Sequence, residues 1–400
     1  MDVARSIRDF NRGRDPERLA LKYTRMRLDA FVFLRGACHL FYARLPAERS
    51  LDRSPAVWAC GDLHLENFGS YKGDNRLAYF DINDFDEAAL APCGRDLVRF
   101  LASVRLGMIE LHLDRPETDR LCQVFLDSYA DALATGKARW IERETSEGLI
   151  RELLDTVSHR CRPELLDSRT GKKRGQRRLL VDGSKALPVS ERQRDKVTAF
   201  MAGFAERQPH PGFYRVLDVA RRIAGTGSLG LERYVILVEG RGSPDGNFLL
   251  DLKRAAPSSL LPGLQLRQPL WESEAHRVVA IQRRVQAVSM AFLQPVRMGR
   301  KDYILRALQP AEDRVALDHR HHRLDRLEAV MRSMGGIVAW GHLRGSGRDG
   351  SAIADELIEY GSGSKWRRRL QQLAEHCAGQ VRADWQTFAA AYDDGDFAVA

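Results

Sequence analysis

Two separate blocks of short, apolar, strand-like sequence interrupt a chain that is otherwise patterned as helices. The first block holds the stretches 56–60 and 77–82, and the second begins near Tyr214. Strands this short bury their apolar side chains only by packing on other elements, so the helical stretches must cover them. Apolar residues make up 44% and charged residues 29% of the chain, which is the balance of a globular protein. The pattern predicts an α+β fold.

The pattern of apolar residues and turns in the second block predicts a small β–β–α–β–β unit. Its predicted elements are strands 233–239 and 247–253, a helix 272–292, and a strand pair 293–297 and 302–308. Because 400 residues exceed the usual size of one domain, we expect two packed lobes. The expected parts are a large helical lobe at 1–210, a small β-rich lobe at 211–310, and C-terminal helices at 311–400 that return to the large lobe.

Compartment and partner class follow from cysteine spacing and charge. The six cysteines are scattered without a CxxC pair, and no signal peptide or membrane span is visible, so we expect a cytoplasmic protein with reduced thiols and no membrane partner. The net charge is +9, but no basic motif is interleaved with aromatic residues. Nucleic acid is therefore not an expected partner, and no feature predicts an oligomeric state.

The densest chemical signal is the stretch 61–69, GDLHLENFG, which follows the first predicted strand. Asp84 comes seventeen residues after Asn67, at the end of the next strand. Carboxylate and amide oxygens suit a hard cation such as Mg²⁺, which also takes phosphate oxygens and water. The spacing fits phosphoryl transfer, with Asp62 accepting the proton of the attacking hydroxyl and Asn67 and Asp84 holding the metal.

A glycine-rich turn in the second block is the other half of the predicted site. Its residues Gly225, Thr226, Gly227, Ser228 and Gly230 form a GxGxxG pattern. A strand follows the turn, whereas a dinucleotide-binding turn leads into a helix, so we expect a β-hairpin whose backbone amides cover phosphates.

Lys253 is one of only ten lysines and ends an apolar strand. A lysine in that position is rarely buried without an anionic partner. We therefore expect Lys253 to bind phosphates of a nucleotide together with the glycine-rich turn.

The early motif resembles the aminoglycoside-phosphotransferase branch of the protein-kinase-like superfamily, where a GD-x-H-x-x-N loop precedes an acidic metal-binding strand. Asp96-Leu97 matches the Asp-Leu that commonly follows there. A closer resemblance, in order over about residues 23–345, is to the uncharacterised bacterial family called domain of unknown function 2252. It is carried by the segments FVFLRGA, CGDLHLENFG, FDINDFDEA, GRDLVRFLAS, GTGSLG and RVVAIQRRVQA.

The kinase-like resemblance implies ATP and Mg²⁺ as cofactors and a partner for Lys253 on the following helix. The family segments point to Gln282 for that partner, whereas charge favours Glu274. Arg35 is expected to supply a cation to the transferring phosphate. Two departures from the kinase pattern, Asp251 before the lysine and Cys60 before the GD pair, bear on nucleotide preference and turnover.

The order of the motifs is the reverse of that in an ordinary kinase, because the catalytic loop precedes the glycine-rich turn. We therefore expect a protein-kinase-like two-lobed fold in circularly permuted order. The acceptor is unknown. The helical insertion 104–211 is the expected place of its recognition, and the basic stretch 172–178, expected to be an exposed loop, favours an acidic acceptor.

Three alternatives remain open from the sequence. The same residues suit transfer of AMP in place of phosphate, and a kinase-like scaffold could bind nucleotide without catalysis. The segment 61–64, GDLH, also resembles the opening of calcineurin-like metallophosphoesterases, but the chain lacks the Asn-His pair which that family needs.

Overall fold

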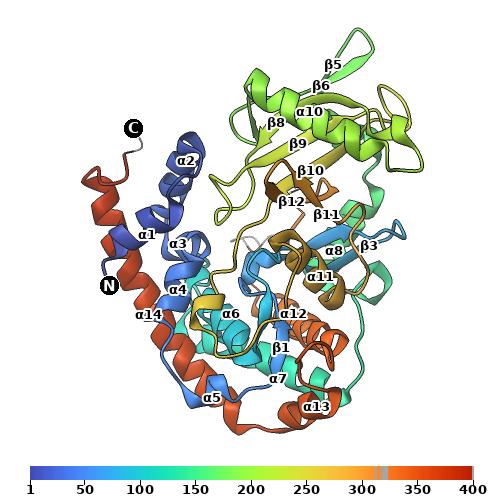
Figure 1. Cartoon of the computed structure of the whole chain (residues 1–400). Coiled ribbons are helices and arrows are strands. Elements are labelled where there is room, and N and C mark those ends of the chain that lie inside the picture. Colours follow the sequence, from blue (N-terminus) through green and yellow to red (C-terminus); the bar gives the residue numbers. More distant parts are fainter. Residues whose placement is uncertain (311–312, 316, 318–322, 399–400) are drawn as a thin grey trace.

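The computed structural model describes residues 1–310, 313–315, 317 and 323–398, drawn in Figure 1. Helices hold 49% of the residues and strands 16%, which confirms the α+β class. The helices are α1 (Val3–Asn11), α2 (Pro16–Met26), α3 (Ala30–Gly36), α4 (Cys38–Arg44), α5 (Arg49–Asp52), α6 (Cys93–Gly107), α7 (Arg115–Thr135), α8 (Gly148–His159), α9 (Arg162–Asp167), α10 (Glu191–Ala205), α11 (Glu274–Val285), α12 (Leu324–Gly345), α13 (Ala354–Ser362) and α14 (Lys365–Asp393). The strands are β1 (Ala56–Ala59), β2 (Phe68–Lys72), β3 (Ala78–Ile82), β4 (Ala89–Pro92), β5 (Thr170–Lys173), β6 (Gln176–Leu179), β7 (Ala186–Leu187), β8 (Val216–Arg222), β9 (Arg233–Val238), β10 (Phe248–Arg254), β11 (Gln294–Met298) and β12 (Lys301–Ala307).

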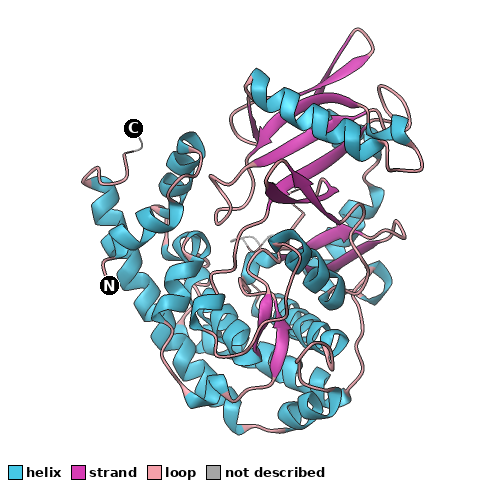
Figure 2. Cartoon of the chain, in the orientation of Figure 1, coloured by secondary structure: helices cyan, strands magenta, loops and turns pink. Residues whose placement is uncertain are grey.

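A six-stranded antiparallel sheet with the order β11-β12-β10-β9-β8-β7 dominates one end of the molecule, at the upper right of Figure 2. Its central strand β9 is buried along its whole length, and successive side chains point to opposite faces. Ile236 and Val238 pack with α10 on one face, while Val235 and Leu237 pack with α9 and β6 on the other. Both faces are therefore covered, which is why the strand reads as a continuous apolar run.

Helices form the rest of the body, around two small strand pairs, β1 with β4 and β2 with β3. The C-terminal helices pack back onto the early ones, α12 on α7 and α14 on α6. Gly335 allows the close approach of α12 to α7, because a Cβ at this position would lie 2.4 Å from the Phe125 carbonyl oxygen of α7. Among the described residues no helix is long and apolar enough to cross a membrane.

The six-stranded sheet includes residues before 211, although the sequence predicts that the β-rich lobe begins at 211. Strand β7 and the covering helix α10 both precede that point, and the stretch 211–310 supplies the other five strands. Helix α11 ends at Val285, seven residues short of the expected end, and the side chain of Gln286 just after it donates to the Ile82 carbonyl.

The basic stretch 172–178, expected to be an exposed loop, instead lies in the hairpin β5–β6. Arg177 within it is 0% exposed and binds the carboxylates of Asp167 and Asp245. Asp245 also binds Lys172, so these acids neutralise part of the stretch. Part of the positive charge of stretch 172–178 is therefore paired with acids of neighbouring segments and is not free for an acidic acceptor.

Candidate functional site

A narrow cavity of about 80 Å³ lies where the early loops, the N-terminal segment and the glycine-rich turn meet. Eight residues expected at a functional site line it: Arg35, Asp62, Asn67, Asp84, Gly225, Thr226, Gly227 and Ser228. The other four, Gly230, Lys253, Glu274 and Gln282, are not among its lining residues. The two sequence blocks, more than a hundred residues apart, thus share one cavity.

The loop that carries Asp62 is fixed by its backbone. Gly61 has φ +79°, and a Cβ there would lie 2.1 Å from the Glu87 carbonyl oxygen, so only glycine fits without a shift. The Asp96 carboxylate accepts the N–H groups of Cys60 and Gly61 at 2.8 and 2.9 Å. Burial nevertheless raises the pKa of Asp96 to about 6. The acid expected from the Asp-Leu pair therefore shapes the turn that precedes Asp62.

Asp62 is paired with Arg99 of α6, whose side chain is 0% exposed. The Arg99 Nε donates to Asp62 Oδ1 at 2.8 Å, and its Nη2 donates to the same oxygen. The other oxygen lies toward the glycine-rich turn, because a Cβ added at Gly227 would be 4.0 Å from Asp62 Oδ2. One oxygen is thus held by the fold, and the other faces the cavity.

Asn67 connects the two acidic loops. Its Nδ2 donates to the carbonyl oxygens of Asp62 and Asp84, both at 3.1 Å, and its Oδ1 accepts the Asp84 N–H at 2.8 Å. The side chain is 3% exposed. A carbonyl oxygen has two lone pairs, so Oδ1 keeps one for a further partner.

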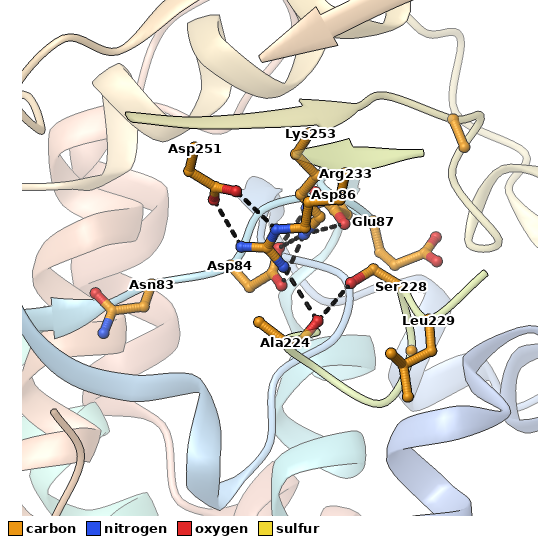
Figure 3. A network of polar contacts seen from close by, with 12 residues as sticks. Asn83, Asp84, Asp86, Glu87, Ala224, Ser228, Leu229, Arg233, Asp251 and Lys253 are labelled. Atoms are coloured by element: carbon orange, nitrogen blue, oxygen red, sulfur yellow. Dashed lines mark hydrogen bonds and ion pairs between the residues drawn. The ribbon is translucent and has the colours of Figure 1, made fainter. Parts of the chain in front are cut away.

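Lys253 reaches across from β10 and contacts two carboxylates of the early loop, as Figure 3 shows. Its Nζ lies 3.1 Å from Asp84 Oδ2 and also binds Asp86. Burial opposes ionisation of Asp84, but Lys253, Arg306 and Arg233 together outweigh burial and lower the pKa of Asp84. Burial and the charge of Asp84 together raise the pKa of Asp86. The lysine is 1% exposed, so this anionic pair accounts for its burial.

The glycine-rich turn joins the antiparallel strands β8 and β9, as a hairpin connection does. Two cations from the N-terminal segment hold its carbonyl groups: Arg14 Nη1 donates to the oxygens of Gly227 and Leu229, and Lys22 Nζ donates to Gly227 at 3.1 Å. Burial lowers the pKa of Lys22 well below its ordinary value. The turn is therefore positioned by α2 and the segment before it as well as by the sheet.

Arg35 faces the cavity but is already paired. Its Nη1 lies 2.7 Å from Glu66 Oε2, and Arg314 donates to the same oxygen at 2.7 Å. Two guanidiniums share one carboxylate here, so the group as a whole keeps a net positive charge.

A cluster of buried charges supports the sheet side of the cavity. Asp251 is 0% exposed and binds Arg222, Arg233 and Arg306. Burial opposes its ionisation, but the guanidiniums outweigh burial and hold the pKa of Asp251 well below its ordinary value. Arg233 also donates to the Ala224 carbonyl, next to the glycine-rich turn (Figure 3). Asp251, which the sequence marks as a departure from the kinase pattern, thus faces three arginines.

Neither expected partner of Lys253 contacts it. Glu274 accepts from Arg277 at 2.7 Å, and Gln282 donates to Gln286 at 3.0 Å. Arg277 in turn donates to the carbonyl oxygens of Asp86 and Ala256. Helix α11 is therefore linked to the acidic loop through an arginine and backbone oxygens.

Several site residues were not singled out from the sequence: Asp86, Glu87, Arg99, Lys22, Arg14 and Glu66. Asp86 and Glu87 lie within the acidic run that begins at Asp84, which was a usable signal. Burial raises the pKa of Glu87 to about 7, although the Ser259 N–H donates to its carboxylate. Nothing local marks Arg99 or Lys22, because both reach partners distant in sequence.

Within the described part of the chain, no group of three or more His, Cys, Asp or Glu side chains is arranged to hold a metal ion. The carboxylates of Asp84 and Asp86 lie close together and are the best candidates for metal ligands, but both bind Lys253 in this structure. A magnesium ion bound with one or two carboxylates, water and phosphate oxygens does not require a larger cluster.

Comparison with known proteins identifies a family without an assigned activity. A family model described as "Uncharacterized protein conserved in bacteria (DUF2252)" matches residues 14–391, nearly the whole chain. No curated protein and no solved structure matches the chain.

Proposed function

The chain belongs to the uncharacterised bacterial family DUF2252, and we propose that it is an ATP- and Mg²⁺-dependent phosphotransferase with a kinase-like fold in circularly permuted order. The observation that carries the proposal is the contact of Lys253 with Asp84, which itself lines the cavity that the glycine-rich turn and Asp62 also border. A glycine-rich hairpin and two acidic loops around one space, with a lysine bound to one of those loops, are the parts that phosphoryl transfer needs.

The chemistry of the donors fits a nucleotide with its metal. Asp84 and Asp86 supply carboxylate oxygens, and Asn67 Oδ1 retains a lone pair, so these residues would hold Mg²⁺. The metal would neutralise charge on the phosphates. Lys253, released from the two aspartates, would bind phosphate oxygens beneath the glycine-rich turn.

Asp62 would orient the acceptor hydroxyl through Oδ2 and take its proton as the new bond forms. Because Arg99 holds Oδ1, the carboxylate cannot rotate freely, and most of its contribution would come from positioning. Arg35 and Arg314, which share the single carboxylate of Glu66, would leave positive charge for the transferring group.

The size of the cavity sets a requirement for this function. Sites for drug-sized ligands have volumes of roughly 300–1,000 Å³. The space here is about 80 Å³, so a nucleoside triphosphate binds only if the contact between Lys253 and the two aspartates opens. The same observation favours a second candidate, a kinase-like scaffold that does not turn over nucleotide.

Thermal-shift titration tests nucleotide binding, which both candidates allow, and a transfer assay then separates them. ATP with Mg²⁺ should stabilise the phosphotransferase by about 2.7 kcal/mol at a hundredfold excess over its dissociation constant. Lys253→Met and Asp84→Asn should abolish that gain. Asp355→Asn, an exposed carboxylate on α13, is the matched control and should keep it.

Transfer is then followed with ATP labelled at the γ- or the α-phosphate, with the protein itself as acceptor. Incorporation of γ-label that Asp62→Asn removes supports phosphoryl transfer, whereas incorporation of α-label identifies AMP transfer. If no nucleotide stabilises the wild-type protein with or without Mg²⁺, the proposal is wrong.

A further inference from the structure

A second cavity, of about 600 Å³, lies on the other side of the glycine-rich turn, between α2, the start of α10 and the ends of β9 and β10. The basic residues that line it are Arg14, Arg18, Arg192, Lys196, Arg254 and Lys301. Only two carboxylates, those of Asp15 and Glu232, line the same space. We propose that this second cavity binds a small phosphorylated molecule.

Both acids of the second cavity are already occupied by other groups. Glu232 binds Lys301, lies 3.5 Å from Lys196 and accepts the Tyr303 hydroxyl. Asp15 caps α2 and binds Arg221 at 2.9 Å. Glu232 therefore compensates the lysines, and Asp15 binds Arg221 with Arg18 3.6 Å away, so two acids face six basic side chains and the cavity keeps a surplus of positive charge.

The arginines retain free donors that point to a ligand. Arg18 is 2% exposed, and its Nε has no hydrogen-bond partner and lies 3.6 Å from Asp15. Over the described ranges, Arg192 and Arg254 have no ion-pair or hydrogen-bond partner for their guanidiniums. Arg18 is buried, Arg254 is half-buried and Arg192 is exposed. The oxygens of a phosphate group accept guanidinium N–H groups in pairs, so these three side chains suit such a ligand.

Strand geometry separates this cavity from the proposed catalytic site. Lys253 and Arg254 are neighbours on β10, and successive side chains of a strand point to opposite faces. Lys253 contacts Asp84, whereas Arg254 lines the second cavity. Arg14 borders both cavities, and its Nη1 donates to Gly227 and Leu229 of the intervening turn. A phosphate bound by Arg14 would therefore compete with its hold on the glycine-rich turn.

The volume and shape favour a small molecule over a nucleic acid. The space lies in the usual range for small-molecule sites. A single-stranded nucleic acid would need aromatic faces for base stacking, and the lining Tyr234 is only 2% exposed. The inference does not rest on phosphotransfer, because every basic residue of the second cavity except Arg14 lies outside the first cavity.

Isothermal titration calorimetry with inorganic pyrophosphate and with inorganic phosphate, at constant ionic strength, tests the proposal on the full chain. We expect wild-type protein to bind pyrophosphate and R192Q/R254Q to bind it at least tenfold more weakly. This double variant breaks no internal contact of the two guanidiniums, so unchanged circular dichroism should show that it folds. Exposed Arg368 on α14 provides the control variant R368Q, which should bind as wild type does.

Lys253→Met identifies the cavity that is filled. Retained pyrophosphate binding in K253M, together with the loss in R192Q/R254Q, supports the second cavity. The reverse pattern places the anion in the first cavity and overturns the proposal, as does wild-type protein that binds neither probe at millimolar concentration. A ten-nucleotide RNA that binds more tightly than pyrophosphate, and loses affinity in R192Q/R254Q, would overturn it in favour of nucleic acid.

Discussion

Replacing Arg99 by methionine tests the pairing that holds Asp62. Arg99 is fully buried, binds Asp62 through two N–H groups, donates to the Leu34 carbonyl and stacks over Phe41 with its guanidinium carbon 4.8 Å from the ring centre. Methionine fills similar space but leaves the Asp62 carboxylate partly desolvated without its cation. We expect a large loss of stability, because one partner of a buried pair is removed while the other remains.

Removing one partner of a buried ion pair costs roughly 3–5 kcal/mol. The Asp62 side chain is 21% exposed, so water recovers part of the penalty, and we expect R99M to lower the free energy of unfolding by about 3 kcal/mol. Neutralising the acid as well, in D62N/R99M, should return about 2 kcal/mol of that loss, because no buried charge is then left unpaired.

Urea denaturation followed by circular dichroism measures these differences, with R368M as an exposed-arginine control expected within about 0.5 kcal/mol of wild type. If R99M costs less than about 1 kcal/mol, or if D62N/R99M is no more stable than R99M, the two side chains are not energetically coupled. The description of Asp62 as a carboxylate held on one oxygen would then be wrong.

Two further predictions concern titration and thiol reactivity. Burial raises the pKa of Glu87 from 4.5 to about 7, so the folded state binds the extra proton between these values and stability falls as pH rises through that window. E87Q lacks this decline, and its free energy of unfolding relative to wild type should rise by about 3 kcal/mol from pH 4.5 to 7.5 in urea titrations; a constant difference would contradict the buried carboxyl. Cys161 is the exposed cysteine and the other five are buried, so a thiol reagent should modify one thiol per folded chain rapidly and all six after unfolding. Rapid loss of more than one thiol without unfolding would contradict the burial.

Much of the secondary structure could be predicted because it depends on local periodicity. The expected strands 233–239, 247–253 and 302–308 correspond to β9, β10 and β12, within one or two residues at each end. The short strand β7 was missed because two residues carry no period, and they become a strand only by pairing with β8.

The candidate site also has residues that the sequence predicts and contacts that only the structure shows. Residue type and spacing predicted that Asp62, Asn67 and Asp84 share one site, and the structure places all three on one cavity. The partner of Lys253 was not found on α11, because the nearer carboxylates of Asp84 and Asp86 come from the other block.

The order of amino acids alone determined the α+β class, the family and the two motifs, because apolar period, turn residues and motif spacing are properties of neighbouring positions. Only tertiary structure decided how charges are paired: Arg99 with Asp62, three arginines around Asp251, and the surplus of cations in the second cavity. Charge pairing acts over a few ångströms in space and is strong only where water is excluded, and neither distance nor burial can be read along the chain.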